Sequence, residues 1–178
     1  MAHENQPGFA LWITGLPASG KSVITWAVVV KLRERGIPVT VLESDEMRKQ
    51  FSAQPSYDAQ DRDYFYGSLA FIGKILTEQG IAVIFDATAN RRAYRDRARQ
   101  QIPRFLEVYI DTPLETCIQR DPKGIYRKAN AGEARHVPGL QAVYEAPLNP
   151  DIVIYGGMEN PEVAATRIVE MLETRGII

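Results

Sequence analysis

The chain has very little cysteine and no long apolar run. Cys117 is its only cysteine, so an internal disulfide is excluded, and we expect a reduced, buried thiol. The longest apolar stretch, Val23 to Val30, lies between two lysines and is far shorter than the roughly 20 residues that span a bilayer. The polar stretch from Met1 to Gly8 carries no secretory pattern. These features predict a cytoplasmic protein with no membrane partner.

An excess of charge of either sign is also lacking. The 21 lysines and arginines are balanced by 22 aspartates and glutamates, which leaves a formal net charge of -1 at pH 7. A protein that binds nucleic acid mainly through phosphate contacts would need a basic surface, so we expect no nucleic-acid partner. With 178 residues, of which 45% are hydrophobic, the chain suits one compact domain spanning residues 1–178.

Short apolar segments alternate with longer helical patterns along the whole chain. We expect strands at 9–13, 39–42, 81–85, 105–110 and 151–155, and helices at 21–35, 64–78, 91–101, 113–120 (capped by Thr112) and 161–174. This alternation predicts a three-layer α/β fold with a parallel central sheet. Two stretches read as irregular, 50–63 and 121–150, and we interpret the second, longer one as a lid.

The most specific motif follows the first predicted strand. It matches the pattern G-x-x-x-x-G-K-[ST] of a P-loop and consists of Gly15, Leu16, Pro17, Ala18, Ser19, Gly20, Lys21 and Ser22. Its glycines allow a tight turn whose N–H groups, with the positive end of the following helix, can cradle phosphates. Lys21 would reach the β- and γ-phosphates of ATP, and Ser22 would offer its hydroxyl to Mg²⁺. The alternative is a glycine turn that precedes Lys-Ser by chance.

Carboxylates follow the second and third predicted strands. Asp45 comes shortly after the second, and Asp86 directly ends the third. Ligands gather at the carboxyl ends of parallel strands, so Asp45 could accept a hydroxyl proton or help to hold Mg²⁺. Arg48 would share its helical face and could bind an anion. Ordinary helix caps and solvated charges are the alternative for all three residues, and a part for Asp86 in Mg²⁺ binding stays open.

Basic residues form two further groups. In the first, Arg91, Arg95 and Arg99 share one helical stripe, which we interpret as a solvated face, with Arg91 or Arg92 as an alternative anion contact. The second group lies in the predicted lid, where cations can close onto a polyphosphate and neutralise transition-state charge. Its members are Arg120, Lys123, Arg127, Lys128 and Arg135. A solvated loop is the alternative for this group.

These residues also resemble a known family, the adenylylsulfate (APS) kinases, from about Phe9 to Ile154. The most specific likeness is the block 105–117 followed by Arg120-Asp-Pro-Lys-Gly-Ile-Tyr-Arg-Lys-Ala129, and it continues in 144–150. The family transfers the γ-phosphoryl group of ATP to the 3′-hydroxyl of adenosine 5′-phosphosulfate. The resemblance thus implies ATP and APS as ligands, Mg²⁺ as cofactor, and a homodimer as one expected assembly.

Carried over position by position, the resemblance assigns roles to individual residues. Asp45 matches the second aspartate of the family's Asp-Gly-Asp-Asn motif and becomes the base, while Lys21 of the glycine loop is the second catalytic residue and neutralises the transferring phosphoryl group. Arg48 and Arg62 match arginines that hold APS, and Tyr57 stands where the family has a phenylalanine that stacks on the substrate adenine. We further assign Arg120 to ATP binding, and Asn90 and Arg135 to the acceptor side.

The departures from the family concentrate on the acceptor side. Phe65 stands where a substrate-binding asparagine is expected, and Val137 where a second stacking aromatic is expected. Residues 90–92 replace a Ser-Pro-Tyr motif, and Glu43-Ser44 replaces Asp-Gly. Three alternatives therefore stay open: a related kinase of another nucleotide-linked or sugar metabolite, a nucleotide-dependent regulatory module, and a polynucleotide kinase, which the near-neutral charge disfavours.

Overall fold

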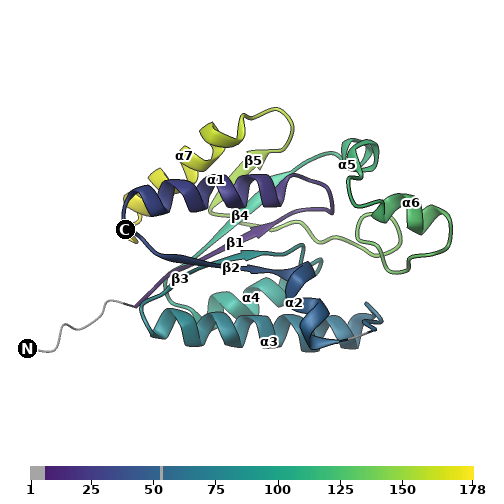
Figure 1. The fold of residues 1–178 in the computed structure, drawn as a ribbon, viewed down its shortest axis with the longest axis horizontal. Helices are drawn as coiled ribbons and strands as arrows, with labels where there is room; N and C mark the ends of the chain where they lie inside the picture. The colour runs from purple at the N-terminus through teal and green to yellow at the C-terminus, as the bar shows by residue number, and fades with distance from the viewer. Residues whose placement is uncertain (1–6, 53) are drawn as a thin grey trace, which may run out of the picture.

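The computed structural model describes residues 7–52 and 54–178, so most of the polar stretch 1–8 lies outside the described residues. Five strands form one parallel sheet in the order β2-β3-β1-β4-β5 (Figure 1). The strands are β1 (Ala10–Thr14), β2 (Val39–Glu43), β3 (Ala82–Asp86), β4 (Phe105–Asp111) and β5 (Ile152–Tyr155). The predicted α/β class with a parallel sheet is confirmed.

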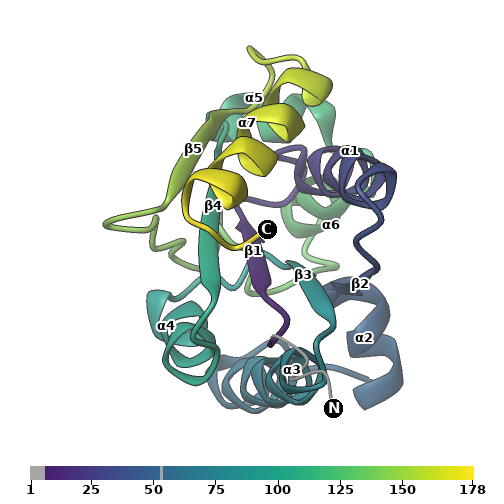
Figure 2. The same cartoon turned by 90° about the vertical axis from the view of Figure 1, so that its left-hand side faces the viewer.

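Helices cover both faces of this sheet. The helices of the described residues are α1 (Lys21–Glu34), α2 (Ser44–Phe51), α3 (Ala59–Glu78), α4 (Arg92–Gln101), α5 (Leu114–Arg120), α6 (Ile125–Asn130) and α7 (Pro161–Thr174), of which α5 and α6 lie beyond the strand ends (Figure 1). Helices α1 and α7 lie on one face and α3 and α4 on the other (Figure 2). The central strand β1 is buried on both sides, since Leu11 and Ile13 pack toward α1 and α7 while Ala10 and Trp12 pack toward α3 and α4.

The start of α3 and the cap of α5 differ from the sequence expectation. Helix α3 begins at Ala59, well before the predicted 64, because Asp58 caps its polar first turn by accepting bonds from the backbone N–H groups of Gln60 and Asp61. The interval 50–63 is therefore only partly irregular. The prediction that Thr112 caps α5 is wrong: its hydroxyl donates instead to the backbone oxygen of Ser19, at 2.9 Å, and ties β4 to the glycine loop.

The predicted lid is also more ordered than its sequence indicates. Helix α6 lies inside it, and a small hydrophobic cluster of Cys117, Tyr126, Ala129 and Val137 packs against Leu16 and Ala18 of the glycine loop. Tyr126 donates a hydrogen bond to the backbone oxygen of Pro17 at 3.0 Å. The expectation of a wholly irregular segment at 121–150 is therefore wrong, because its first part has a core of its own.

The prediction of a solvated arginine face on α4 is wrong for Arg95, whose side chain is 1% exposed. Its Nε donates to Glu107 at 2.6 Å, and its two terminal nitrogens donate to the backbone oxygens of Ala89 and Glu145. Glu107 is itself buried on β4 and also contacts Arg99 at 3.4 Å. Helical periodicity could not reveal this, because the partners come from distant parts of the chain.

We expect Arg95→Met to lower the free energy of unfolding by about 3 kcal/mol, because the buried Glu107 carboxylate would lose its main partner. Arg97→Met on the same helix is the matched control, since the Arg97–Asp63 pair is partly exposed to solvent, at 35% and 56%, and its loss should cost less than about 1 kcal/mol. Urea denaturation of both variants measures the difference. Equal effects would contradict a structural role for the buried pair.

Candidate active site

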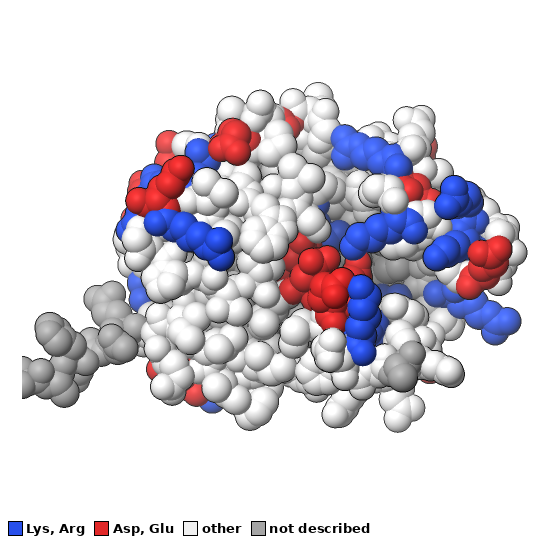
Figure 3. All heavy atoms as spheres, viewed as in Figure 1, with Lys and Arg blue, Asp and Glu red and all other residues white. Residues whose placement is uncertain are grey.

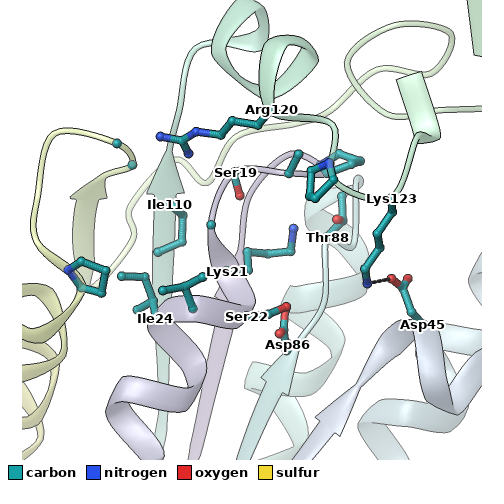
Figure 4. Close-up of a pocket in the computed structure, with 18 of the residues that line it drawn as sticks. Ser19, Lys21, Ser22, Ile24, Asp45, Asp86, Thr88, Ile110, Arg120 and Lys123 are labelled. Carbon is teal, nitrogen blue, oxygen red and sulfur yellow. Dashed lines mark hydrogen bonds and ion pairs between the residues drawn. The ribbon is translucent and has the colours of Figure 1, made fainter. Parts of the chain in front are cut away.

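A pocket of about 550 Å³ opens at the carboxyl ends of the strands, above the glycine loop (Figure 4). Its wall combines the loop and the start of α1 with the ends of β2 and β3, the turn after α5, and the turn after β5. The sequence placed ligands at this edge of a parallel sheet, and the loop lies between β1 and α1 as a phosphate-binding loop requires.

The shape of the glycine loop depends on two glycines. A Cβ atom at Gly15 would lie 2.7 Å from the backbone oxygen of Ile110 and 2.7 Å from Ser19 Oγ, so a side chain has no room there. Gly20 has φ of 106° and occupies the N-cap of α1, a conformation that residues with a Cβ rarely adopt. The first N–H groups of α1 are thus directed at the pocket.

Lys21 is directed into the pocket from the first turn of α1 (Figure 4). Its ammonium group donates to the backbone oxygens of Leu16 at 2.8 Å and Gly15 at 3.2 Å. Burial lowers the pKa of Lys21, and the nearby Asp86 carboxylate acts in the opposite direction. The hydrogen bonds of Lys21 go to neutral loop oxygens, and no carboxylate among the described residues forms an ion pair with it, so a phosphate group is a fitting partner.

Asp86 lies at the end of β3, opposite Lys21, and is 4% exposed. Burial raises the pKa of its carboxyl group. The charge of Lys21 and a hydrogen bond with the Ser22 hydroxyl lower this pKa, but by less than burial raises it. Ser22 and Asp86 thus present two oxygen groups side by side, near Lys21 (Figure 4). A hydroxyl and one carboxylate are the protein groups that Mg²⁺ commonly uses when phosphates complete its coordination.

Ser19 adds a further polar group to this wall. Its hydroxyl is buried and has no hydrogen-bond partner among the residues that the structure describes. A buried hydroxyl without a partner is costly, and a bound phosphate oxygen could satisfy it.

Asp45 lies in the first turn of α2, on the opposite side of the pocket from Arg120. Neither Ser44 nor Asp45 caps this helix, since its N-cap is Glu43. The Asp45 carboxylate is instead free to bind Lys123, whose Nζ lies 2.6 Å away. The two residues are 78 positions apart in the chain, and the sequence did not connect them.

Arg48 is directed away from this pocket, into a cluster of aromatic rings. Its guanidinium donates to Asp61 at 2.8 Å, and its central carbon lies 3.8 Å from the centre of the Phe65 ring and 4.8 Å from that of Tyr57. Arg48 is only 5% exposed, which excludes the solvated alternative. Phe65, the residue at the expected asparagine position, forms the floor beneath this arginine.

Arg62 lies in the same cluster and is 7% exposed. It donates to the backbone oxygens of Tyr57 and His136, both at 2.8 Å, and to the side-chain oxygen of Asn90 at 2.9 Å. All three partners are neutral, and burial lowers the pKa of the guanidinium. Among the described residues no carboxylate forms an ion pair with Arg62, so the cluster holds a buried cation whose charge is uncompensated.

The remaining predicted residues differ in their placement. The Asn90 side chain also donates to the backbone oxygen of Val143 at 2.9 Å, so it joins Arg62 to the segment after the lid. Arg120 lies on the pocket wall, whereas Arg135 is exposed and lies outside that wall. The structure therefore brings Arg48, Tyr57, Arg62 and Asn90 into one cluster beside the pocket, without Arg135.

Gly156 and Gly157 belong to the pocket wall and were missed by the sequence reasoning. A Cβ at Gly156 would lie 1.8 Å from Thr112 Oγ1, and one at Gly157 would lie 2.2 Å from a terminal nitrogen of Arg120. The signal was available: paired glycines directly after the last strand lie at the edge where ligands gather.

A parallel α/β sheet, a phosphate loop before α1 and carboxylates at the ends of the neighbouring strands define a P-loop kinase. The family model described as adenylylsulphate kinase matches residues 7–155, and the chain belongs to this family. The adenylyl-sulfate kinase of Rippkaea orientalis is 38% identical over 173 residues, covering 97% of this chain and 96% of that protein. The corresponding enzyme of Halothermothrix orenii is 36% identical and covers 98% and 95%.

Solved structures agree with this assignment. The APS kinase of Mycobacterium tuberculosis, determined in complex with AMPPNP and APS, superposes with a TM-score of 0.88 at 34% identity, covering 94% of this chain and 98% of that one. The shikimate kinase of Aquifex aeolicus, at 16% identity and a TM-score of 0.56, shares the fold alone. In the part of the chain that the structure describes, no helix has the length and apolarity to cross a membrane.

Proposed function

We propose that this protein transfers the γ-phosphoryl group of ATP to the 3′-hydroxyl of adenosine 5′-phosphosulfate. Membership of the adenylylsulfate kinase family supports the reaction. The observation that carries the acceptor half is the buried Arg62 cation, which has only neutral hydrogen-bond partners. An uncompensated buried charge is unfavourable, so the cluster is suited to an anionic acceptor such as the phosphosulfate group.

The residues divide into a donor half and an acceptor half. On the donor side, the loop N–H groups and Lys21 hold the β- and γ-phosphates, and Arg120 with Gly157 forms the wall for the nucleotide. On the acceptor side, Arg48 and Arg62 bind the anionic group, and Tyr57, 41% exposed, offers a ring for the adenine. Arg135 is exposed and lies outside the pocket wall, so we assign it no contact with either substrate.

Asp45 lines the pocket, on the same helix as Arg48, and serves as the base. As the bond from the γ-phosphorus to the bridging oxygen of ADP breaks, a new bond forms to the acceptor oxygen, and the hydroxyl proton passes to the Asp45 carboxylate. The core of the lid lies on the glycine loop, and closure of this segment over bound ATP would exclude the water that otherwise hydrolyses it.

Mg²⁺ fits the pair formed by Ser22 and Asp86. Among residues 7–52 and 54–178, no group of three or more acidic, histidine or cysteine side chains is arranged to hold a metal by itself. A hydroxyl beside one carboxylate is the set expected for a magnesium ion that arrives with ATP, to which Ser22 would bind directly and Asp86 from the strand end. The ion would neutralise phosphate charge there.

A second candidate is a kinase of another hydroxyl-bearing anionic metabolite. It is favoured by Phe65 and Val137, which are 2% and 5% exposed and are committed to packing where the family pattern led us to expect substrate contacts. The cytoplasm, from the single cysteine and the lack of a secretory pattern, and a homodimer, from family resemblance, are our proposals for location and assembly.

A coupled assay of ADP release tests the proposal on APS against a panel of hydroxyl-bearing nucleotides and sugars. We expect saturable turnover on APS and, by chromatography, the 3′-phosphorylated product. Turnover on another acceptor with none on APS would favour the second candidate. Slow hydrolysis of ATP with every acceptor, and no phosphorylated product, would show that the protein is not a kinase of these metabolites.

A further inference from the structure

Lys123 has an anchored backbone and a long side chain that is more than half exposed. Its turn is held by a hydrogen bond from the Gly124 N–H to the backbone oxygen of Asp121, at 3.0 Å. The following helix is joined to the glycine loop through Tyr126 and Pro17. The Lys123 side chain itself is 56% exposed, so the anchor of the turn does not restrict the position of its ammonium group.

In the free protein this ammonium group is bound to two carboxylates across the pocket. Its Nζ lies 2.6 Å from Asp45 Oδ2 and 3.6 Å from Glu43 Oε1. Burial alone would lower the pKa of Lys123, but the hydrogen bond and charge of Asp45, with Glu43 beyond, outweigh burial and raise it. Figure 3 shows the same complementarity on a larger scale, with acidic side chains gathered near α2 and basic ones over α5 and α6.

The same pocket is where ATP is expected to place its γ-phosphate. The residues that line it include Lys21, Ser22, Asp86 and Lys123. The Lys123 ammonium group extends to Asp45, at the start of α2 (Figure 4). A polyphosphate entering there brings more negative charge than the two carboxylates hold. Without Lys123, the Asp45 and Glu43 carboxylates would repel this polyphosphate from the pocket wall.

We propose that Lys123 is a catalytic residue that exchanges partners: it leaves Asp45 and binds the γ-phosphoryl group when ATP occupies the loop. Two consequences follow. The transferring group gains a second ammonium besides Lys21, and the Asp45 oxygen held by Lys123 becomes available to an acceptor hydroxyl. The second consequence rests on the proposed function, because it needs Asp45 to be the base. The first requires only that the loop binds ATP.

A double-mutant cycle on nucleotide binding tests the exchange without any acceptor. The affinity for AMPPNP with Mg²⁺ is measured by calorimetry for the wild type, Asp45→Asn, Lys123→Met and the double variant. Asp45→Asn removes both the competitor for Lys123 and a charge that repels phosphate. In the Lys123→Met background only the repulsion is removed, so the comparison isolates the partner exchange.

The sign of the difference decides the outcome. If Lys123 moves to the phosphate, Asp45→Asn strengthens binding by about three-fold more in the lysine background than in the methionine background, as expected for a half-exposed pair. If Lys123 stays on Asp45, it shields that carboxylate, and Asp45→Asn has the larger effect in the methionine background. That result, or equal effects, would overturn the proposal.

Turnover provides a second readout. Lys123→Met should lower kcat by about 100-fold, as for loss of one charge on a transferring group, and Lys123→Arg should restore part of it. Lys74→Met is the control for loss of a lysine charge, because Lys74 lies on α3, pairs with Glu78 at 2.6 Å and is outside the pocket wall, and its kcat should stay unchanged. Thermal unfolding verifies that each variant is folded. Failure of APS turnover in the wild type would reject the acceptor assignment but leave the binding cycle interpretable.

Discussion

Replacing Asp45 by asparagine is expected to lower kcat by about 1000-fold, because asparagine cannot accept the acceptor proton. The affinity for AMPPNP should not weaken, since Asp45 lies across the pocket from the loop and its loss frees Lys123. Rapid-quench measurement of phosphoryl transfer, alongside calorimetry of nucleotide binding, separates the two effects. The predicted pattern is a lost chemical step with an intact donor site.

Glu46→Gln is the matched control for Asp45. Glu46 is the next residue in the same helical turn and pairs with Lys49 on the exposed side, at 2.6 Å. Its replacement removes the same charge from α2 without touching the pocket, so kcat should change by less than about two-fold. A comparable loss in both variants would mean that the charge of this helix matters more than a base at Asp45.

Replacing Arg62 by methionine should lower kcat/KM for APS by about 100-fold or more, since a hydrogen-bonded buried charge facing an anion contributes several kcal/mol. The KM for ATP should stay within about two-fold, because Arg62 lies outside the pocket wall that holds the loop. Arg62→Lys keeps the charge but loses the planar fork, so an intermediate value is expected. Steady-state kinetics with each substrate varied in turn provide the measurement.

Arg91→Met is the control for Arg62. Arg91 is exposed at the N-cap of α4, and it was the sequence alternative for an anion contact on this side. The change should leave kcat/KM for APS near the wild-type value. If Arg91→Met lowered kcat/KM for APS as far as Arg62→Met, the acceptor would lie toward α4, and the role of the buried cluster would be rejected.

The donor half could be predicted closely from the sequence because its determinants are local. A phosphate loop needs consecutive residues with particular backbone freedom, and Gly15, Gly20, Lys21 and Ser22 appear in one contiguous motif. Strand ends are also local, so Asp45 and Asp86 were placed at the correct edge of the sheet. Local patterns failed where a side chain that could cap a helix bonds to a distant group instead. The Thr112 hydroxyl, for example, donates to the backbone oxygen of Ser19.

The acceptor half could be predicted only as a set of residue types. The Arg62 and Asn90 side chains, 28 positions apart, meet through α3 and the turn after β3, and the backbone oxygen of His136 joins them from the lid. Hydrophobic periodicity along the sequence does not predict contacts between residues so far apart. The same limit explains the error at Arg95, whose helical stripe is solvated at Arg91 but buried where it meets Glu107.

The amino-acid sequence by itself determined the class of fold, the phosphate loop and the identity of the groups that can do chemistry, because these depend on spacing along the chain. Only the tertiary structure decided which charges are compensated: Asp45 is paired with Lys123, whereas Arg62 is buried among neutral acceptors. Compensation depends on distance and burial, which arise when separate elements pack together.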